Sequence, residues 1–545
     1  MRTIFYHGTI VTMDEERPSA GAMCIEDGKI RKVGSDEEVL AWKDALTQSG
    51  ATEWNESEDT MVDLNGKTVL PGFIDAHSHF TGLANSLMQC DLSEAESFDE
   101  IVSLMRKFLA EHPVEEGTQV VGCNYDHNFL KEQRHPDKFV LDRISTRHEI
   151  VLVHASSHMG VVNSPALEHA GITAETPDPE GGRYGRVAGS QEPDGYMEEN
   201  AFIHFQNRSA QFDMAKLLEM MEKAQDIYAS HGVTTIQEGM VNEGLFQLLQ
   251  YAANQNILKL DVVGYLDVQT CRQLMKEHQE YQNTYGNHLK IGGYKVFLDG
   301  SPQGRTAWML EPYEDSKDYH GYPVLSDERL HELITIALED HQQLLAHCNG
   351  DAAAEQYVTQ FEKAAAEHPG LDTMRPVMVH AQLVHKEQLK RMIPLSMMPS
   401  FFVAHTYYWG DIHLKNFGLE RASRISPANT AGKLGLPFTF HQDSPVLQPD
   451  MLKTIWCAVN RRTRGGVVLG EEERISVEDA LRAVTIHAAY QYREEAQKGS
   501  ITAGKAADFV ILDQNPLAVA PEELADIAVL ETYKDGVRCW RRNQV

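Results

Sequence analysis

Two histidines, His77 and His79, stand one residue apart directly after an apolar run over residues 69–74. We expect this run to be a short buried strand, because it is apolar and is entered from a Gly-Lys turn. Residues two apart on a strand point to the same side, so the two imidazoles can face one point. Neutral imidazole is the commonest protein ligand for zinc and similar ions. The pair indicates a metal site, although a lone His-x-His is also found on surfaces and in cores.

Four more side chains that suit a metal site stand near the ends of later predicted strands. Lys295 lies on the predicted fourth strand, His347 and His380 end the fifth and sixth, and Asp443 ends the eighth. In a barrel of parallel strands, these carboxyl ends meet at one mouth, where catalytic residues sit. We therefore expect the four side chains to join the histidine pair. The alternative for Lys295 is a structural ion pair with an acid such as Asp299.

The elements that must position these residues form an alternating pattern of strands and helices. The predicted strands span residues 69–76, 233–239, 258–266, 291–299, 343–347, 376–382, 395–402 and 436–443. Helical patterns over 327–341 and 352–368 fall between later strands. Eight strands with intervening helices predict a (β/α)8 TIM barrel of the α/β class.

The rest of the chain divides into two β-rich ends and one insertion. Residues 1–68 contain short strands and a helix over 36–46, and residues 486–545 contain further strands and turns. The gap after the first barrel strand, about 80–230, is too long for one crossover helix. Such a segment is either functional or a surface excursion, and the sequence leaves both open.

Several motifs resemble the amidohydrolase superfamily. Residues 71–79, Pro-Gly-Phe-Ile-Asp-Ala-His-Ser-His, resemble its first-strand signature, and residues 499–510 resemble its C-terminal signature. Residues 297–307, 347–353 and 163–167 are similar to the amidohydrolase-3 group, which includes N-substituted formamide deformylases and proteins named as exoenzyme regulators. The resemblance covers essentially the whole chain. It implies a composite β-sandwich from residues 1–68 and 486–545 beside a metal-dependent barrel over 69–485.

The resemblance also implies a ligand set. The order His77, His79, Lys295, His347, His380 and Asp443 resembles the two-metal pattern of the superfamily, in which the lysine is carboxylated and bridges two ions. An ammonium cannot ligate a cation, whereas a carbamate offers two anionic oxygens. A buried lysine near positive charge can lose its proton, so the modification is chemically reasonable. The expected cofactor is one or two divalent ions, with zinc favoured.

The ligand set implies a hydrolytic mechanism. A divalent ion lowers the pKa of water, and Asp443 then serves as the general base. Arg305 either grips an anionic substrate group or forms a structural ion pair, and His158 either binds substrate or lies at the surface. The aromatic residues after the seventh strand either line a substrate pocket or pack. His441 stands where the group often has glycine, which leaves the substrate preference open.

Three functions are compatible with some or all of these residues. The first is a hydrolase of a non-peptide C–N bond in an N-acyl, N-formyl or cyclic amide. The second is a single-metal deaminase of a nitrogen heterocycle, which would explain the histidines but not Lys295. The third is a non-catalytic regulatory protein, which we would expect to have lost some ligands, whereas all six are present.

Composition favours a soluble cytoplasmic protein, and the resemblance implies an enzyme with a small-molecule substrate. The 545 residues carry 80 acidic and 49 basic side chains, a net charge of −31, which disfavours nucleic acid and anionic membranes as partners. Seven scattered cysteines without a Cys-x-x-Cys pair favour a reducing compartment. The N-terminus lacks the pattern of a signal peptide, and no apolar run approaches a membrane span. A homo-oligomer stays open.

Overall fold

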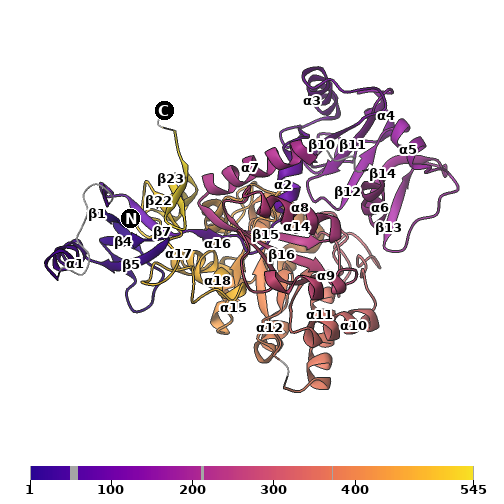
Figure 1. Ribbon diagram of the computed structural model, residues 1–545. Helices are drawn as coiled ribbons and strands as arrows, with labels where there is room; N and C mark the ends of the chain where they lie inside the picture. The colour runs from indigo at the N-terminus through magenta and orange to yellow at the C-terminus, as the bar shows by residue number, and fades with distance from the viewer. Residues whose placement is uncertain (1, 50–58, 210–213, 371, 544–545) are drawn as a thin grey trace. The chain divides into compact units, whose positions relative to one another are not determined.

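The computed structural model describes residues 2–49, 59–209, 214–370 and 372–543 (Figure 1). The chain forms two compact units. The main unit comprises Met1–Phe80, Glu222–Leu298 and Leu325–Val545. The second unit comprises Thr81–Met221 and Asp299–Val324, so it also takes in residues that follow the fourth barrel strand.

An eight-stranded parallel sheet forms the centre of the main unit, and its strands are adjacent in the order of the chain. They are β8 (Phe73–Ile74), β15 (Val233–Val241), β16 (Asp261–Asp267), β17 (Leu289–Phe297), β18 (Gln343–Cys348), β19 (Val377–His380), β20 (Met398–Phe401) and β21 (Thr439–Phe440). Between them lie α8 (Glu243–Asn254), α9 (Arg272–Glu277), α10 (Asp327–Glu339), α11 (Asp351–Glu367), α12 (Lys386–Met392), α13 (His405–Tyr408), α14 (Gly410–Ser423) and α15 (Ala428–Lys433). The alternation gives a barrel-like α/β fold (Figure 1), as the sequence pattern predicts.

The prediction of one strand over residues 69–76 is wrong, because this segment is two short strands in different sheets. β7 (Thr68–Pro71) pairs with strands from both chain ends, whereas β8 pairs with β15 of the barrel-like sheet. Gly72 separates them: a Cβ atom at this position would lie 2.5 Å from the side chain of Thr234. The close approach of the two backbones therefore requires glycine.

Two further sheets of the main unit combine both ends of the chain. One has the order β5-β4-β1-β6 and the other β24-β23-β22-β7-β2-β3. Their strands are β1 (Arg2–Tyr6), β2 (Thr9–Val11), β3 (Ser19–Ala20), β4 (Ala22–Glu26), β5 (Lys29–Gly34), β6 (Thr60–Asp63), β22 (Phe509–Leu512), β23 (Val529–Lys534) and β24 (Val537–Arg541). Of the remaining helices, α1 (Asp36–Ser49) contacts β4 and β5, while α17 (Val477–Ala483) and α18 (Ile486–Gln491) contact β21 of the barrel-like sheet, and α16 (Met451–Asn460) contacts α17. Phe5 from the first strand packs against Phe509 and Tyr533 near the C-terminus, so one hydrophobic cluster joins the two ends.

The second unit contains a six-stranded sheet in the order β13-β14-β12-β11-β10-β9. Its strands are β9 (Cys90–Asp91), β10 (Gln119–Tyr125), β11 (Glu149–His154), β12 (Met159–Val162), β13 (Gly182–Arg186) and β14 (Pro193–Glu199). Its helices include α3 (Phe98–Glu111), α4 (Lys138–Asp142), α5 (Ser164–Ala170) and α6 (Asn200–Ser209); α2 (Phe80–Ser86) and α7 (Met214–Ser230) cross its boundaries. The sequence predicts helices over 98–111 and 214–231, a strand over 149–154 and a loop over 176–194, and the two helices and the strand are confirmed as α3, α7 and β11. The loop prediction is wrong because β13, an edge strand of sequence Gly-Arg-Tyr-Gly-Arg, has no apolar alternation.

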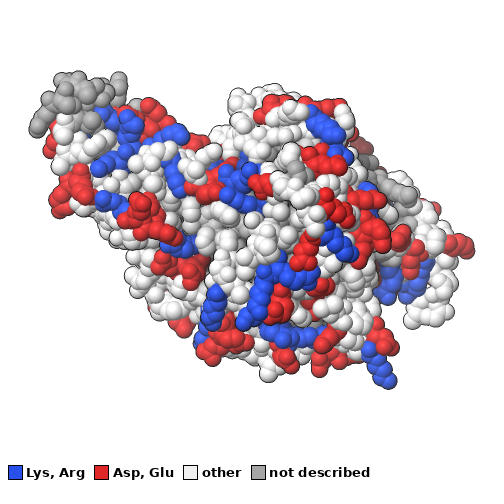
Figure 2. All heavy atoms as spheres, turned by 90° about the horizontal axis from the view of Figure 1, so that it is seen from below, with Lys and Arg blue, Asp and Glu red and all other residues white. Residues whose placement is uncertain are grey.

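Among the described residues, no helix is long and apolar enough to cross a membrane. The face drawn in Figure 2 carries acidic and basic side chains interspersed. The excess of acidic residues is therefore not gathered into one patch on that face.

A buried ionic network connects the barrel-like sheet to the terminal sheets. Lys498 Nζ lies 2.5 Å from Oδ2 of Asp261 on β16, and Lys534 Nζ of β23 lies 3.1 Å from the same oxygen. Lys498 also lies 3.2 Å from Glu494, which pairs with Lys290 of β17. Burial acts to raise the pKa of Asp261, but Lys498 and Lys534 hold it below its usual value. The network stabilises the fold only while its charges stay paired.

Replacement of Lys498 by methionine tests this network. The variant leaves Asp261 buried with fewer cations, which costs about 3–5 kcal/mol and lowers the thermal unfolding midpoint by at least ~5 °C at pH 7. Because the pKa of Asp261 is depressed in the folded state, its stabilisation is present above about pH 4 and is lost as the pH falls further. The difference from the wild type should therefore shrink at pH 3. Lys390→Met, which removes a half-exposed partner of Glu387, is the control and should shift the midpoint little.

Candidate active site

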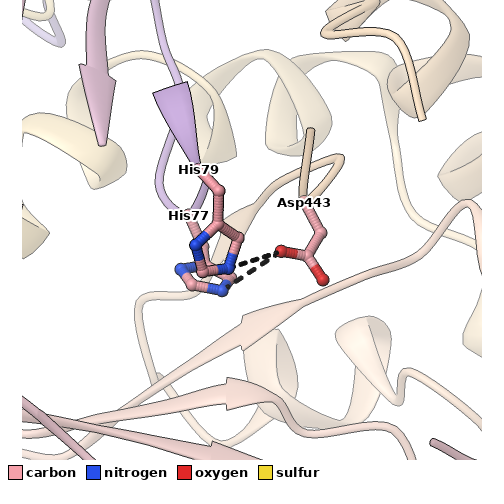
Figure 3. Close-up of side chains that lie close together, drawn as sticks. All are labelled: His77, His79 and Asp443. Atoms are coloured by element: carbon pink, nitrogen blue, oxygen red, sulfur yellow. Dashed lines mark ion pairs between the residues drawn. The ribbon is translucent and has the colours of Figure 1, made fainter. Parts of the chain in front are cut away.

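His77 and His79 follow β8 and converge on the carboxylate of Asp443, which follows β21 (Figure 3). Nε2 of His77 lies 3.3 Å and Nε2 of His79 lies 3.5 Å from Oδ1 of Asp443. Ligands of a tetrahedral zinc ion at bond lengths near 2.0–2.1 Å stand about 3.3–3.5 Å apart. These three side chains have the spacing of a metal site.

Lys295 of β17 lies beside the histidine pair. Its Nζ is 3.3 Å from Nε2 of His77, and its side chain is fully buried. Burial lowers the pKa of Lys295 to about 7, and the nearby Asp443 only partly opposes this effect. A large fraction of the amine is therefore neutral near pH 7, which is the form that reacts with carbon dioxide.

His347 is the last residue but one of β18 and His380 is the last residue of β19, and their rings meet edge to face. Nδ1 of His347 is 3.1 Å from Nε2 of His380, and the latter atom is 3.9 Å from Oδ2 of Asp443. The structure thus brings together at one edge of the sheet all six residues that the sequence singled out. Their roles as ligands stay a prediction.

Residues of β15 orient the first two histidines. Nδ1 of His77 lies 2.5 Å from Oε1 of Gln237, and Nδ1 of His79 lies 3.0 Å from the carbonyl oxygen of Gly239. Both acceptors hold the ring proton on Nδ1, so each Nε2 atom keeps its lone pair toward Asp443. The sequence carries no signal for these two partners beyond their place near the end of a predicted strand.

His441 supports His380 in the same manner. Nδ1 of His380 lies 3.1 Å from Nε2 of His441, whose Nδ1 lies 2.9 Å from Oγ of Ser400. A proton on each Nδ1 satisfies this chain and leaves Nε2 of His380 with its lone pair. His441 is fully buried, and its ring also packs edge-on against His77. The sequence marks His441 as a departure from the related group but does not predict this contact.

The asparagine that follows the fifth strand orients His347. Nδ2 of Asn349 lies 3.0 Å from Nε2 of His347. The oxygen and nitrogen of the Asn349 side-chain amide have nearly the same size and shape, so a half-turn of the amide places Oδ1 at this position. With the oxygen facing the ring, the Nε2 hydrogen is donated and Nδ1 keeps its lone pair toward His380.

The backbone at two of these residues has an uncommon conformation. His380 and Asp443 have φ angles of 72° and 54°, in the left-handed region that side chains other than glycine rarely adopt. Each residue stands where its strand ends, so the turn aims the side chain toward the other candidates. Such strain is concentrated at functional sites, where the surrounding structure holds it.

The donor set fits a divalent cation. Burial acts to raise the pKa of Asp443, but His77 and His79 hold it below its usual value, so the group is a carboxylate at neutral pH. Within the described part of the chain, Oδ1 of Asp443 is buried and has no hydrogen-bond partner in good geometry. Burial also lowers the pKa of His77 and of His380, which keeps both rings neutral. Neutral imidazoles around an ionised carboxylate form a site for a cation.

The two predicted substrate-binding residues lie in the second unit. Nδ1 of His158 is 2.8 Å from Oε2 of Glu199. Arg305 pairs with Asp315, at 2.9 Å between Nη1 and Oδ2, and lines a cavity of about 570 Å³ together with Arg183. The contact of Arg305 is the structural ion pair that the sequence left as its alternative, whereas His158 is mostly buried against Glu199 rather than lying at the surface. A role in substrate binding is untested for both residues.

The aromatic residues after the seventh strand are mainly packed. His405 is buried, stacks on His413 and contacts Trp409. Tyr407 lies under the ammonium of Lys453, with Nζ 4.1 Å from the ring centre. These contacts match the packing alternative for this segment.

Comparison with known proteins agrees with the geometry. The sequence model of the Amidohydrolase family matches residues 60–539. The chain belongs to this family. The expectation of an amidohydrolase-type enzyme is confirmed, and membership of the family supports metal-dependent hydrolase activity.

Matches to individual relatives extend over nearly the whole length of this chain. The N-substituted formamide deformylase of Arthrobacter pascens is 27% identical over 98% of this chain and 98% of its own. The putative amidohydrolase YtcJ of Bacillus subtilis is 27% identical over 98% of this chain and 99% of its own. The fold also aligns with the crystal structure of an uncharacterized metal-dependent hydrolase from Pyrococcus horikoshii, with a TM-score of 0.76 and 24% identity. The alignment covers 96% of this chain and 99% of the Pyrococcus horikoshii chain.

The support that His441 gives to His380 can be tested by His441→Phe, which fills the same space without a hydrogen-bond acceptor. Because partners of metal-binding histidines orient them, we expect affinity for zinc at this site to fall about 10–100-fold in competition with a chelator. His413→Phe, at an equally buried position whose ring contacts His405 and Phe417, should keep the wild-type affinity. Equal zinc affinities in the two variants would show that His441 does not position His380.

Proposed function

We propose that this protein is a metal-dependent hydrolase that cleaves a non-peptide C–N bond in an N-acyl, N-formyl or cyclic amide. The observation that carries the proposal is the convergence, at one edge of the parallel sheet, of the six side chains that we propose as metal ligands. The name of the Arthrobacter pascens relative, a formamide deformylase, supports this choice of bond. The fold that we propose is a closed (β/α)8 barrel beside a β-sandwich built from the two chain ends.

We assign the ligands to two groups. His77, His79 and Asp443 would hold one ion, because their donor atoms share one point. His347 and His380 would hold a second ion. Lys295 would join the two as a carbamate, formed when its neutral amine adds carbon dioxide and releases a proton. Zinc suits the imidazole and carboxylate donors.

Asp443 is the residue that we assign to proton transfer. A divalent metal supplies Lewis acidity, lowering the pKa of water toward neutrality and polarising a carbonyl oxygen. Asp443 takes the proton from the attacking water as general base and returns it to the leaving nitrogen as general acid. The two transfers balance, so the carboxylate ends in its starting state.

A deaminase is the second candidate, and Lys295 separates it from the first. A deaminase with a single ion would use the same histidines but has no need for a buried lysine beside His77. It would release ammonia from a heterocycle, whereas the proposed hydrolase releases an amine and a carboxylate such as formate.

The proposed reaction is tested on a panel of N-formyl, N-acyl and cyclic amides with detection of released amine. We expect turnover that stops on chelation and returns with zinc. Asp443→Asn should lower kcat at least ~10²-fold, the usual range for loss of a general base. Asp99→Asn, an exposed acid of the second unit, is the control and should keep activity. Release of ammonia from heterocycles without amide hydrolysis would favour the deaminase.

The carbamate is tested by Lys295→Met. We expect the variant to bind at least one metal ion fewer per chain than the wild type, as measured by elemental analysis. Native mass spectrometry of the wild type should show the mass of one added carbon dioxide, lost on acidification and absent from the variant. An unmodified Lys295 with an unchanged metal content would leave Lys295 without a bridging role.

A further inference from the structure

The second unit contains its own group of metal-ligating side chains. Asp126 and His127 directly follow β10, and His154 is the last residue of β11. These strands are parallel neighbours in which Tyr125 pairs with His154. Their carboxyl ends therefore deliver the three side chains to one place, the edge at which ligands of parallel strands bind.

The three donor atoms have the spacing of ligands. Nδ1 of His127 lies 3.1 Å from Nε2 of His154. Oδ1 of Asp126 lies 3.5 Å from that Nε2 atom and 3.8 Å from Nδ1 of His127. Two ligand atoms bound to the same tetrahedral zinc ion stand about 3.3–3.5 Å apart, because each bond is about 2.0–2.1 Å long. The two distances to Nε2 of His154 are close to this range, and the distance of 3.8 Å from Asp126 to His127 is slightly longer.

The three side chains are mostly enclosed but reach solvent. His154 and Asp126 are buried, while the His127 side chain is 19% exposed, so the group has a route to solvent. His135 stacks on His127 with ring centres 3.9 Å apart, and its Nδ1 lies 3.0 Å from the hydroxyl of Tyr125. These contacts hold the His127 ring in place beside the other two side chains.

We propose that Asp126, His127 and His154 form a second metal site, which binds a divalent ion of the zinc type between the ends of β10 and β11. The two imidazoles and one carboxylate suit zinc, and three protein ligands leave its fourth position to water. The ion would tie together two adjacent strand ends of the second unit. This inference does not depend on the proposed hydrolysis.

Partners of the ligands are in place for this binding. Oδ1 of Asp126 accepts hydrogen bonds from the backbone N–H and the side-chain amide of Asn128, both at 2.9 Å, which fix the carboxylate. Nδ1 of His154 lies 3.0 Å from Oγ of Ser156 and accepts the backbone N–H of Ser156. Zinc at Nε2 of His154 requires the ring proton on Nδ1. There Oγ of Ser156 can accept it, while the backbone N–H of Ser156 gives up its contact with the ring. Ser156 thus becomes the partner that orients this ligand.

The test measures zinc bound to the full chain by elemental analysis after dialysis against a weak chelator. We expect His154→Ala and Asp126→Asn each to hold one zinc ion fewer per chain than the wild type. His169→Ala, which removes an exposed histidine of the same unit, should hold the wild-type amount. Ser156→Ala, which keeps all three ligands, should bind this ion about 10-fold more weakly.

A variant that lacks both His77 and His79 separates this site from the one in the main unit. We expect it to retain the zinc ion of the second unit and to lose that ion on further replacement of His154. Zinc should also raise the thermal unfolding midpoint of the His77, His79 variant, and this rise should vanish with His154→Ala. Zinc contents that do not differ between the wild type, His154→Ala, Asp126→Asn and Ser156→Ala would overturn the proposal.

Discussion

The main unit depends on keeping buried imidazoles neutral around one ionised carboxylate. An ionised acid in the interior is costly unless it is paired, and His77, His79 and His380 surround Asp443 without carrying charge of their own. Burial lowers the pKa of each ring, whereas the pKa of Asp443 is lowered by the neighbouring His77 and His79 against the effect of burial. Such an arrangement is complete only with a cation among the donor atoms.

The rest of the unit holds those donors in position. The parallel sheet places the ends of β8, β17, β18, β19 and β21 at one edge, and the backbone then turns abruptly at His380 and Asp443. A second layer of hydrogen bonds from Gln237, Gly239 and His441 decides which nitrogen of each ring faces the centre. Strand order sets the approximate positions, and this second layer sets the tautomers.

The sequence predicts the parallel strands and the six candidates because hydrophobic runs and their terminal polar residues are local features. It fails where the outcome depends on partners far along the chain. The split of residues 69–76 into β7 and β8 follows from pairing with β22, more than 400 residues away. The edge strand β13 lacks alternation, and the contact of His441 with His380 needs the assembled sheet. No local feature of the sequence indicates the split of the first strand, the edge strand β13 or the contact between His441 and His380.

Binding of divalent metal by the six candidates of the main unit can be seen in crystals of catalytically active protein grown with zinc and measured at the zinc absorption edge. We expect an anomalous peak within about 2.0–2.2 Å of Nε2 of His77, Nε2 of His79 and the carboxylate of Asp443. An active preparation that shows no anomalous peak among these side chains would contradict this expectation.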